Sequence, residues 1–521
     1  MSTEYRVYGP PGCGKTTYIA AQATQMADQY GEDQVSICSL TNTAVREAVG
    51  RELSLPDENI TTLHARCKRS LQAPPPAEAF IEDFIAAYPR FAGEGCLPPG
   101  LRRVRRKLDE PETTDEVMIS GSREPTYYER VQILRQQMIP ESQWQPTLRS
   151  WYGAWSDFMA QTGRLDFTGW LEAAREEQCL PAQQVVYVDE AQDHTPLQLS
   201  VIRSWQTRHR VLVGDDDQNL YEWSGAIPAE FFAYPIPDGH EKVLEQSYRV
   251  PRAVHAAAER WVRRLRSRRD KVYLPRGEDG ALYHNTYSLQ QAEGGLLPPH
   301  LRNSEPGTVM ILASAGYLLD PVIQLLRAEG IPFHNPYRRS NSTWNPLGTT
   351  GRALAAYLQP AWTGNEAYRW LNVLRSTGVF RSGQRKAALE WVQRMGRHEV
   401  LLEDLHNFLL PTTISRVEHE DLSLFEERRK GVPGDWSYAL DIYRRLSAEE
   451  RVPRVIVGTI HSVKGGQADH VYLMPDLSPA AYEDLWGPNA DRIIRLMYVG
   501  MTRARVSLTL GGEATRRAVS W

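Results

Sequence analysis

One apolar run in this chain ends in three carboxylates, and an amide and an aromatic ring follow close behind. Residues 211–214 lead into the acidic triplet 215–217 and then Gln218, and Trp223 comes five residues later. Burying like charges is costly, so a buried strand rarely ends this way unless the charges are used. The amide could contact a phosphate group, and the ring could stack on an unpaired base with little regard to base sequence.

A glycine-rich loop near the N-terminus has the spacing of a phosphate-binding site. Residues 9–16 read GPPGCGKT, which matches G-x-x-x-x-G-K-[ST], between a strand-like run and a helical pattern. The backbone N–H groups of such a loop hold phosphate oxygens, Lys15 would reach the outer phosphates, and Thr16 would bind Mg²⁺. A chance glycine-rich turn is the alternative, and the full pattern in this context argues against it. The predicted nucleotide-binding residues of the loop are Gly9, Pro10, Pro11, Gly12, Cys13, Gly14, Lys15, Thr16 and Thr17.

A β-rich run, residues 183–188, ends in Asp189 and Glu190. Beside a phosphate loop, the Asp would help to hold Mg²⁺ and the Glu would orient and deprotonate the attacking water. The alternative is a solvated acidic turn, and this pair alone does not decide between the two. Together with the phosphate loop, it predicts a nucleoside triphosphatase.

Composition excludes several other classes of protein. The 521 residues are too many for one hydrophobic core, because single cores stop growing near ~250–300 residues. A net charge of -4 means that any nucleic-acid site must be a local groove. Five cysteines without a CxxC pair argue against zinc, iron–sulfur and disulfide frameworks, and they favour a reducing cytoplasm. We expect no signal peptide and no membrane span.

A series of stretches in the chain resembles, in order, the motifs of superfamily 1A DNA helicases of the UvrD/Rep/PcrA type. The order and spacing of the whole series make coincidence negligible. The stretches read GPPGCGKT (9–16), SLTNTAVREA (39–48), TTLHARCKRSL (61–71), RLDF (164–167), DEAQD (189–193), GDDDQNLYEWSGA (214–226), LEQSYR (244–249), VIVGTIHSVKGGQADHVYL (455–473) and RLMYVGMTRAR (495–505).

This resemblance implies an α/β fold and a role for each matching residue. The fold would be two RecA-like P-loop NTPase motor domains, with parallel sheets flanked by helices and a mainly helical insertion in each. ATP and Mg²⁺ would be the cofactors, with Thr16 and Asp189 as the metal-binding residues. The implied catalytic residues are Lys15, Asp189, Glu190, Gln218, Arg249 and Arg503. Tyr248, Gly465 and Gln467 would also contact the nucleotide. The implied DNA-binding residues are Thr41, Asn42, Thr62, His64, Tyr221, Trp223, Thr459 and His461.

Two of these catalytic residues, Arg249 and Arg503, would be arginine fingers from the second motor domain. They lie far from the phosphate loop in sequence, so they would complete the site only when two domains close. Departures from the family predict tuning of the site and not its loss. No glutamine motif precedes the phosphate loop, so nucleotide selectivity would be relaxed or supplied by Tyr248. Leu40, Ser224 and Gln467 stand where relatives often have Phe, Arg and an acid.

The motif order predicts how the domains divide the chain. Domain 1A would comprise residues 1–75 and 164–250, with insertion 1B at 76–163. Domain 2A would comprise residues 251–338 and 451–521, with insertion 2B at 339–450. Residues 307–313 and 506–510 read as strands, and 352–358 and 387–395 as parts of helices.

Two further patterns allow more than one reading. Apolar residues from Leu148 to Met159 have helical spacing, which favours a buried helix face over a DNA platform. Basic runs at 102–107 and 263–271 are usually solvated faces. The first could equally bind phosphate near a duplex junction, whereas the second reads as an exposed helix face.

The resemblance implies an ATP-dependent single-stranded DNA translocase and DNA helicase that moves 3′ to 5′. Its substrates would be single-stranded DNA and junctions between single-stranded and duplex DNA, in DNA repair, recombination or replication, in the cytoplasm of a bacterium or of a phage host. Two alternatives stay open: an ATP-dependent nucleic-acid-binding switch or recruitment factor with little unwinding, and an RNA motor of the same fold. The sequence holds no sugar-reading signal that separates DNA from RNA.

Overall fold

The structure is a computed structural model in which residues 2–40, 55–93, 95–98, 101, 125–178, 183–285, 301, 307–338, 344–429 and 433–521 are described. Thr41, Asn42 and the basic run 102–107 therefore lie outside the described residues. The chain divides into two compact units. The first comprises Met1–Tyr283, Asp476–Leu508 and Arg517–Trp521, and the second comprises His284–Pro475 and Thr509–Arg516.

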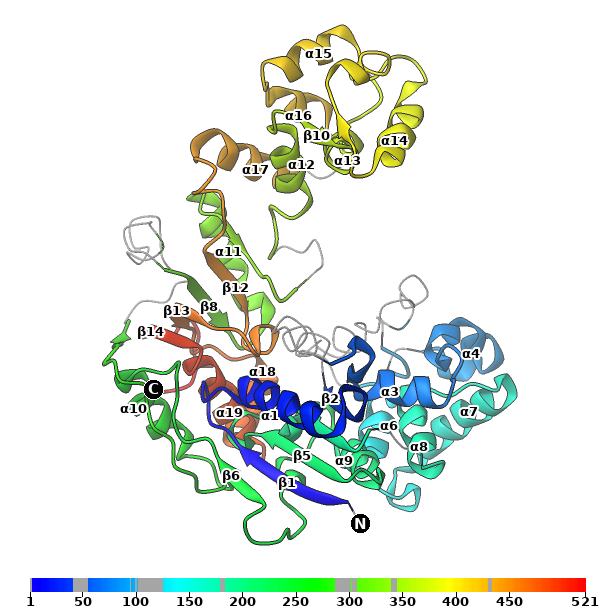
Figure 1. The fold of residues 1–521 in the computed structure, drawn as a ribbon, viewed down its shortest axis with the longest axis vertical. Helices are drawn as coiled ribbons and strands as arrows, with labels where there is room; N and C mark the ends of the chain where they lie inside the picture. The colour runs from blue at the N-terminus through cyan, green and yellow to red at the C-terminus, as the bar shows by residue number, and fades with distance from the viewer. Residues whose placement is uncertain are drawn as a thin grey trace. The chain divides into compact units, whose positions relative to one another are not determined.

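The first unit is built on a six-stranded parallel sheet with the order β3-β2-β4-β5-β1-β6. Its strands are β1 (Thr3–Tyr8), β2 (Val35–Ser39), β3 (Ile60–Thr62), β4 (Val185–Val188), β5 (His209–Gly214) and β6 (Glu241–Val243). The carboxyl ends of parallel strands share one edge of the sheet. The phosphate loop after β1 and the acidic segments after β4 and β5 therefore meet at this edge (Figure 1).

Helices cover both faces of this sheet. On β4, Val185 and Tyr187 pack on the side of α1 (Lys15–Tyr30), while Val186 and Val188 belong to the core on the other side. Burial on both faces explains why β4 reads as a continuous apolar run, VVYV. The helices of the second face are α3 (Leu63–Ser70), α8 (Phe167–Glu176) and α9 (Pro196–Ser204).

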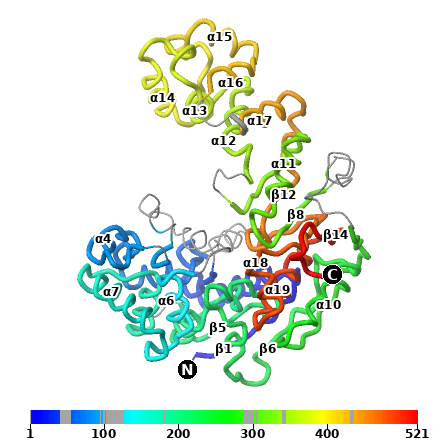
Figure 2. Tube along the Cα trace, turned by 180° about the vertical axis from the view of Figure 1, so that it is seen from behind, coloured from blue at the N-terminus to red at the C-terminus, as the bar shows by residue number. Residues whose placement is uncertain are grey.

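A helical layer with its own core is inserted between β3 and β4. Its main helices are α4 (Ile81–Ala87), α6 (Tyr127–Gln136) and α7 (Pro146–Thr162), and they gather together in both views (Figures 1 and 2). Trp151 and Trp155 stack within this core at a centroid distance of 5.8 Å, and both are fully buried. The aromatic stripe of α7 is therefore the buried helix face that its spacing predicts.

The first unit also contains α10 (Arg252–Val262), α18 (Pro479–Trp486) and α19 (Ala490–Met501). The basic run 263–271 is not the exposed helix face that the sequence indicated, because α10 ends at Val262 and the segment continues without helix. Arg266 donates to the carbonyls of Gly487 and Pro488. Three further cations pair with carboxylates: Arg268 with Asp217, Arg269 with Glu241, and Lys271 with the triplet 215–217.

A second six-stranded sheet has the order β7-β14-β13-β8-β12-β9. Within the second unit, β8 pairs in parallel with both β12 and β13, and β9 pairs in parallel with β12. The strands predicted at 307–313 and 506–510 are present as β8 and β14. The elements are β7 (Ala281–His284), β8 (Val309–Ala313), α11 (Asp320–Ala328), β9 (Phe333–His334), β12 (Val455–Thr459), β13 (Ala468–Leu473) and β14 (Ala504–Leu510).

The second unit carries a helical insertion between β9 and β12, seen in yellow and orange in Figure 2. Its separate core centres on residues such as Trp370, Phe425 and Trp436. The insertion comprises α12 (Thr349–Tyr357), β10 (Trp362–Thr363), α13 (Gly364–Asn372), α14 (Gln384–Met395), β11 (Glu399–Val400), α15 (Pro411–Glu418), α16 (Ser423–Arg428) and α17 (Pro433–Arg445). Across the described residues, none of the helices combines the length and apolarity needed to span a membrane.

These two sheets, each flanked by helices and each with a helical insertion, confirm the predicted fold of two RecA-like α/β domains. The division into compact units groups residues 251–283 and 476–508 with the phosphate loop. The motif-based domain boundaries stay a prediction.

Candidate nucleotide and nucleic-acid site

The phosphate loop closes on itself before α1 begins. Gly12 and Gly14 have φ angles of 74° and 79°, in the left-handed region that glycine adopts without strain. Gly14 caps α1, and Gly9 N–H donates to the Gly214 carbonyl at 2.9 Å, which ties the loop to the end of β5. Lys15 Nζ donates to the Gly9 carbonyl at 2.9 Å and so lies folded over the loop.

Residues 247–249, next in the chain after β6, pack directly on this loop. Tyr248 N–H donates to the Gly12 carbonyl at 2.8 Å, and Ser247 Oγ donates to the Pro11 carbonyl at 2.9 Å. A Cβ atom on Gly12 would lie 2.5 Å from Arg249 Cβ, so only glycine fits here. Tyr248 is 73% exposed, and its ring lies beside Gly14. An exposed ring at the mouth of a phosphate loop is free to stack on a nucleotide base.

The acidic pair after β4 faces the same loop. Thr16 Oγ1 donates to Asp189 Oδ2 at 3.5 Å, and Asp189 Oδ1 accepts from Glu190 N–H at 2.9 Å. Glu190 has a φ of 50°, a strained conformation of the kind that clusters at functional sites. A hydroxyl and a buried carboxylate at this separation are the hard oxygen ligands that Mg²⁺ prefers, so Thr16 and Asp189 fit the ion.

The electrostatic environment keeps Lys15 charged. Burial alone would lower the pKa of Lys15, but the negative charges of Glu190, Asp215 and Asp189 outweigh it and raise the pKa. A cation held inside a ring of acids attracts a polyanion such as a triphosphate chain once a metal ion offsets part of the acidic charge.

Gln218 lies between an acid and an arginine. Its Nε2 donates to Asp215 Oδ2 at 2.6 Å, and its Oε1 accepts from Arg503 Nη2 at 3.3 Å. Arg503 is only 2% exposed, and it also donates from Nε to the Val499 carbonyl. Arg249 Nη1 donates to the Thr502 carbonyl at 3.5 Å. The six predicted catalytic residues therefore all belong to the first unit, which brings the sequence-distant Arg249 and Arg503 to the edge that holds Lys15, Asp189, Glu190 and Gln218.

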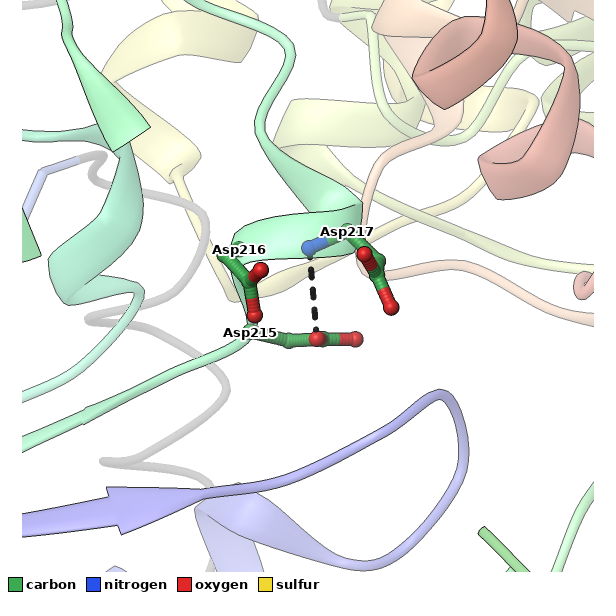
Figure 3. Close-up of side chains that lie close together, drawn as sticks. All are labelled: Asp215, Asp216 and Asp217. Atoms are coloured by element: carbon green, nitrogen blue, oxygen red, sulfur yellow. Dashed lines mark hydrogen bonds between the residues drawn. The ribbon is translucent and has the colours of Figure 1, made fainter. Parts of the chain in front are cut away.

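The acidic triplet 215–217 surrounds one buried cation. Figure 3 shows the three carboxylates close together, with the Asp217 N–H donating to Asp215 Oδ1. Three oxygens within 4.8 Å of one another could hold a metal ion. Lys271 Nζ fills that position instead, at 2.6, 2.5 and 3.0 Å from Asp215, Asp216 and Asp217. The triplet is therefore an internal ion cluster and not a metal site.

The loop beyond the triplet carries the predicted base-stacking residues. Tyr221 and Trp223 lie with ring centroids 6.0 Å apart, and both are partly exposed. Glu222 between them accepts from Arg495 Nη1 at 2.7 Å and from Arg492 Nε at 3.4 Å, and both arginines are on α19. The aromatic loop is therefore anchored to the helix that precedes Arg503.

Two other predicted DNA-binding residues have structural partners. Thr62 Oγ1 accepts from Ala65 N–H and caps α3. Burial lowers the pKa of His64 to about 4, so its ring is neutral at physiological pH, and it packs edge-on against Phe167. Of the four predicted residues in the second unit, Thr459 is buried and its hydroxyl accepts from Ser462 N–H, and Gly465 has a φ of 86°. His461 and Gln467 lie on either side of that glycine in the chain.

Sequence reasoning missed Lys271, Arg495 and Glu222. A signal for the first was present, because three successive buried acids require a cation and the basic run 263–271 supplies one. Nothing in the sequence pairs Glu222 with Arg495, since the two residues are 273 positions apart.

The fold and the phosphate loop together define a P-loop NTPase with two RecA-like domains. Within that class, the chain is similar to superfamily 1 helicases of the UvrD/Rep/PcrA type, as its motifs indicate. The family described as AAA domain matches residues 2–224.

Three relatives carry helicase names. The ATP-dependent DNA helicase UvrD2 of Mycobacterium tuberculosis is 27% identical over 377 residues, which cover 66% of this chain and 49% of that protein. The ATP-dependent DNA helicase PcrA of Bacillus subtilis is 29% identical over 101 residues, covering 19% of this chain and 14% of PcrA. A probable DNA helicase II homolog of Mycoplasma genitalium is 25% identical over 291 residues, covering 48% and 39%. The chain thus spans about half the length of UvrD2.

Proposed function

We propose that this protein is an ATP-driven single-stranded DNA translocase and DNA helicase. The observation that carries the proposal is the contact of Gln218 with Arg503, at the same sheet edge as Lys15, Asp189 and Glu190. The helicase names of the relatives support DNA as the substrate. Movement from 3′ to 5′, binding to junctions of single-stranded and duplex DNA, and a role in repair, recombination or replication follow from the motif resemblance.

Hydrolysis requires each residue to act on a different part of the triphosphate. Lys15 and the N–H groups of the loop bind the outer phosphates, and Tyr248 stacks on the base. Mg²⁺, held by Thr16 and Asp189, would neutralise charge on the phosphate oxygens. Glu190 orients the attacking water and accepts its proton. Arg249 and Arg503 stabilise the charge that develops in the transition state, and arginine fingers of this kind contribute ~10³–10⁵ in rate.

Coupling to nucleic acid would run through the segment 215–224. One end of this segment holds Gln218 against Arg503, and the other holds the aromatic loop. Glu222 is bonded to Arg495, on the helix that leads to Arg503. A base that stacks on Trp223 can therefore change the position of Arg503 relative to Gln218, the residue proposed to contact the γ-phosphate. DNA would then stimulate ATP turnover. Gly465 and Gln467 would contact the nucleotide, and the strand contacts would come from Thr62, His64, Thr459 and His461.

The test is ATP hydrolysis by the purified protein with and without a single-stranded DNA oligonucleotide, beside an RNA of the same sequence. Strong stimulation by DNA, together with displacement of a strand from a duplex with a 3′ tail but not a 5′ tail, is expected. An ATPase rate that neither DNA nor RNA changes would overturn the proposed coupling and favour an ATP-dependent binding switch. Stimulation by RNA alone would show that the substrate is RNA, and the protein would still be an ATP-driven motor. The Glu190→Gln variant controls for a contaminating ATPase.

A further inference from the structure

Lys271 is a buried cation with no part in the mechanism above. Its side chain is 1% exposed, and it contacts all three acids of the triplet. It lies nine residues beyond the end of α10, in an irregular segment. A lysine is rarely buried to this extent, so its position is held by these ion pairs.

The contacts of Asp215 connect Lys271 with Gln218. Asp215 Oδ1 accepts from Lys271, whereas Asp215 Oδ2 accepts from Gln218 Nε2 at 2.6 Å. Because this bond fixes the amide nitrogen of Gln218 on the Asp215 side, the amide oxygen faces Arg503. Three polar contacts in series therefore connect Lys271, through Asp215 and Gln218, with Arg503.

Removing Lys271 would disturb this series of contacts at its first residue. Asp215, Asp216 and Asp217 are each no more than 1% exposed, so without Lys271 their charges would repel at close range. Arg268 would remain, but it contacts only Asp217. Asp215 would then lose the cation that is paired with its Oδ1, and the orientation of the Gln218 amide would lose part of its support.

We propose that Lys271 is a positioning residue for ATP hydrolysis. It holds Asp215 so that the amide oxygen of Gln218 faces Arg503 and the Gln218 side chain lies where it contacts the γ-phosphate. The inference rests on the proposed function. It assigns a specific task to Lys271 beyond the charge balance that any buried cation would provide. Replacing a residue that only stabilised the fold would change the affinities for ADP and for ATP equally.

The first experiment compares nucleoside tri- and diphosphate binding. Affinities for ADP and for a non-hydrolysable ATP analogue are measured in Lys271→Met, beside the steady-state kcat and KM. The preference for the triphosphate and the kcat should each fall by about tenfold, while ADP affinity stays unchanged, because Gln218 acts only on the γ-phosphate. Arg268→Met is the matched control: it removes a cation from the same cluster but does not touch Asp215, so it should keep the preference.

A double-mutant cycle tests the path of the effect. If Lys271 acts through Gln218, then adding Lys271→Met to Gln218→Ala should change the triphosphate preference no further. Additive effects would overturn the proposal, as would an equal loss in Arg268→Met. If Lys271→Met does not fold, Asp215→Ala replaces it. That variant cuts the same path and leaves Lys271 paired with Asp216 and Asp217, so an unchanged preference in it would also overturn the proposal.

Failure of the proposed function has a different result. A wild-type protein that does not hydrolyse ATP would refute the motor itself before any variant is compared. Wild-type hydrolysis with an additive cycle would refute the role of Lys271 alone.

Discussion

Arg495 bonds to Glu222 through Nη1 at 2.7 Å and to the Asp216 carbonyl through Nε at 3.0 Å. One buried guanidinium therefore contacts both the acidic triplet 215–217 and the loop that carries Tyr221 and Trp223. The same helix, α19, ends just before Arg503, which contacts Gln218. The segment 215–224 is thus contacted by Arg495 on the helix and by Arg503 just beyond it, and this arrangement supports the proposed coupling of base stacking to phosphate chemistry.

Replacing Glu222 by Gln should weaken that coupling and spare basal hydrolysis. The amide cannot form the ion pairs with Arg495 and Arg492, although the Asp216 carbonyl still holds Arg495. We expect the stimulation of ATP turnover by single-stranded DNA to fall by about tenfold or more, since a partly buried charged hydrogen bond contributes about 1.5–3 kcal/mol and about 1.4 kcal/mol corresponds to a factor of ten. Turnover is measured across a DNA titration. Glu230→Gln on the neighbouring turn is the control, and equal stimulation in both variants would contradict the coupling.

Replacing Glu190 by Gln should abolish turnover and keep nucleotide binding. The amide still fits the site but accepts no proton from water, so kcat should fall by about 10²–10⁴, the usual contribution of a general base. The measurement is single-turnover hydrolysis of ATP beside equilibrium binding of the same nucleotide. Turnover within a few-fold of wild type would show that another group is the base.

Replacing Trp223 by Ala should weaken the grip on single-stranded DNA. A base stacked on an aromatic ring contributes ~1–3 kcal/mol, so the dissociation constant for an oligothymidine should rise by roughly tenfold to a hundredfold. Fluorescence anisotropy of a labelled oligonucleotide measures it. Trp223→Phe should keep most of the affinity. Trp486→Ala, which removes a tryptophan that is 76% exposed on α18, is the matched control. Equal losses at the two positions would argue against a specific stacking site.

The sequence predicted those features that short segments determine. The phosphate loop, Asp189, Gln218 and the strands before them were found because motif spacing and apolar runs are local properties. The contacts of Lys271 and of Arg495 were not found, because they depend on how distant segments pack. The basic run 263–271 was misread as a helix face for the same reason: its Arg268 and Lys271 pair with the buried acids of the triplet 215–217, and composition alone does not reveal these partners.

A buried acid in the helical layer of the first unit gives a further test, one that is independent of nucleotide. Glu78 is fully buried, and its Oε1 accepts from Tyr128 OH at 2.7 Å and from Phe167 N–H at 3.1 Å. Burial, together with the nearby charge of Asp166, raises the pKa of Glu78 to about 8. The carboxyl group is therefore mostly protonated in the folded protein at neutral pH.

This raised pKa predicts how stability depends on pH. Between pH 4.5, the ordinary value for Glu, and about 8, the folded state binds more protons than the unfolded state, so stability falls as pH rises. The loss is complete above about pH 8 and amounts to about 5 kcal/mol at most, because the pKa differs by roughly 3.5 between the two states. Glu78→Gln keeps an oxygen that accepts both hydrogen bonds and has no charge to bury. We expect it to unfold at higher denaturant concentration than wild type at pH 9 and to match wild type near pH 5. Denaturation of both proteins across this range measures the difference. A constant gap between the two curves would mean that Glu78 does not titrate with a raised pKa.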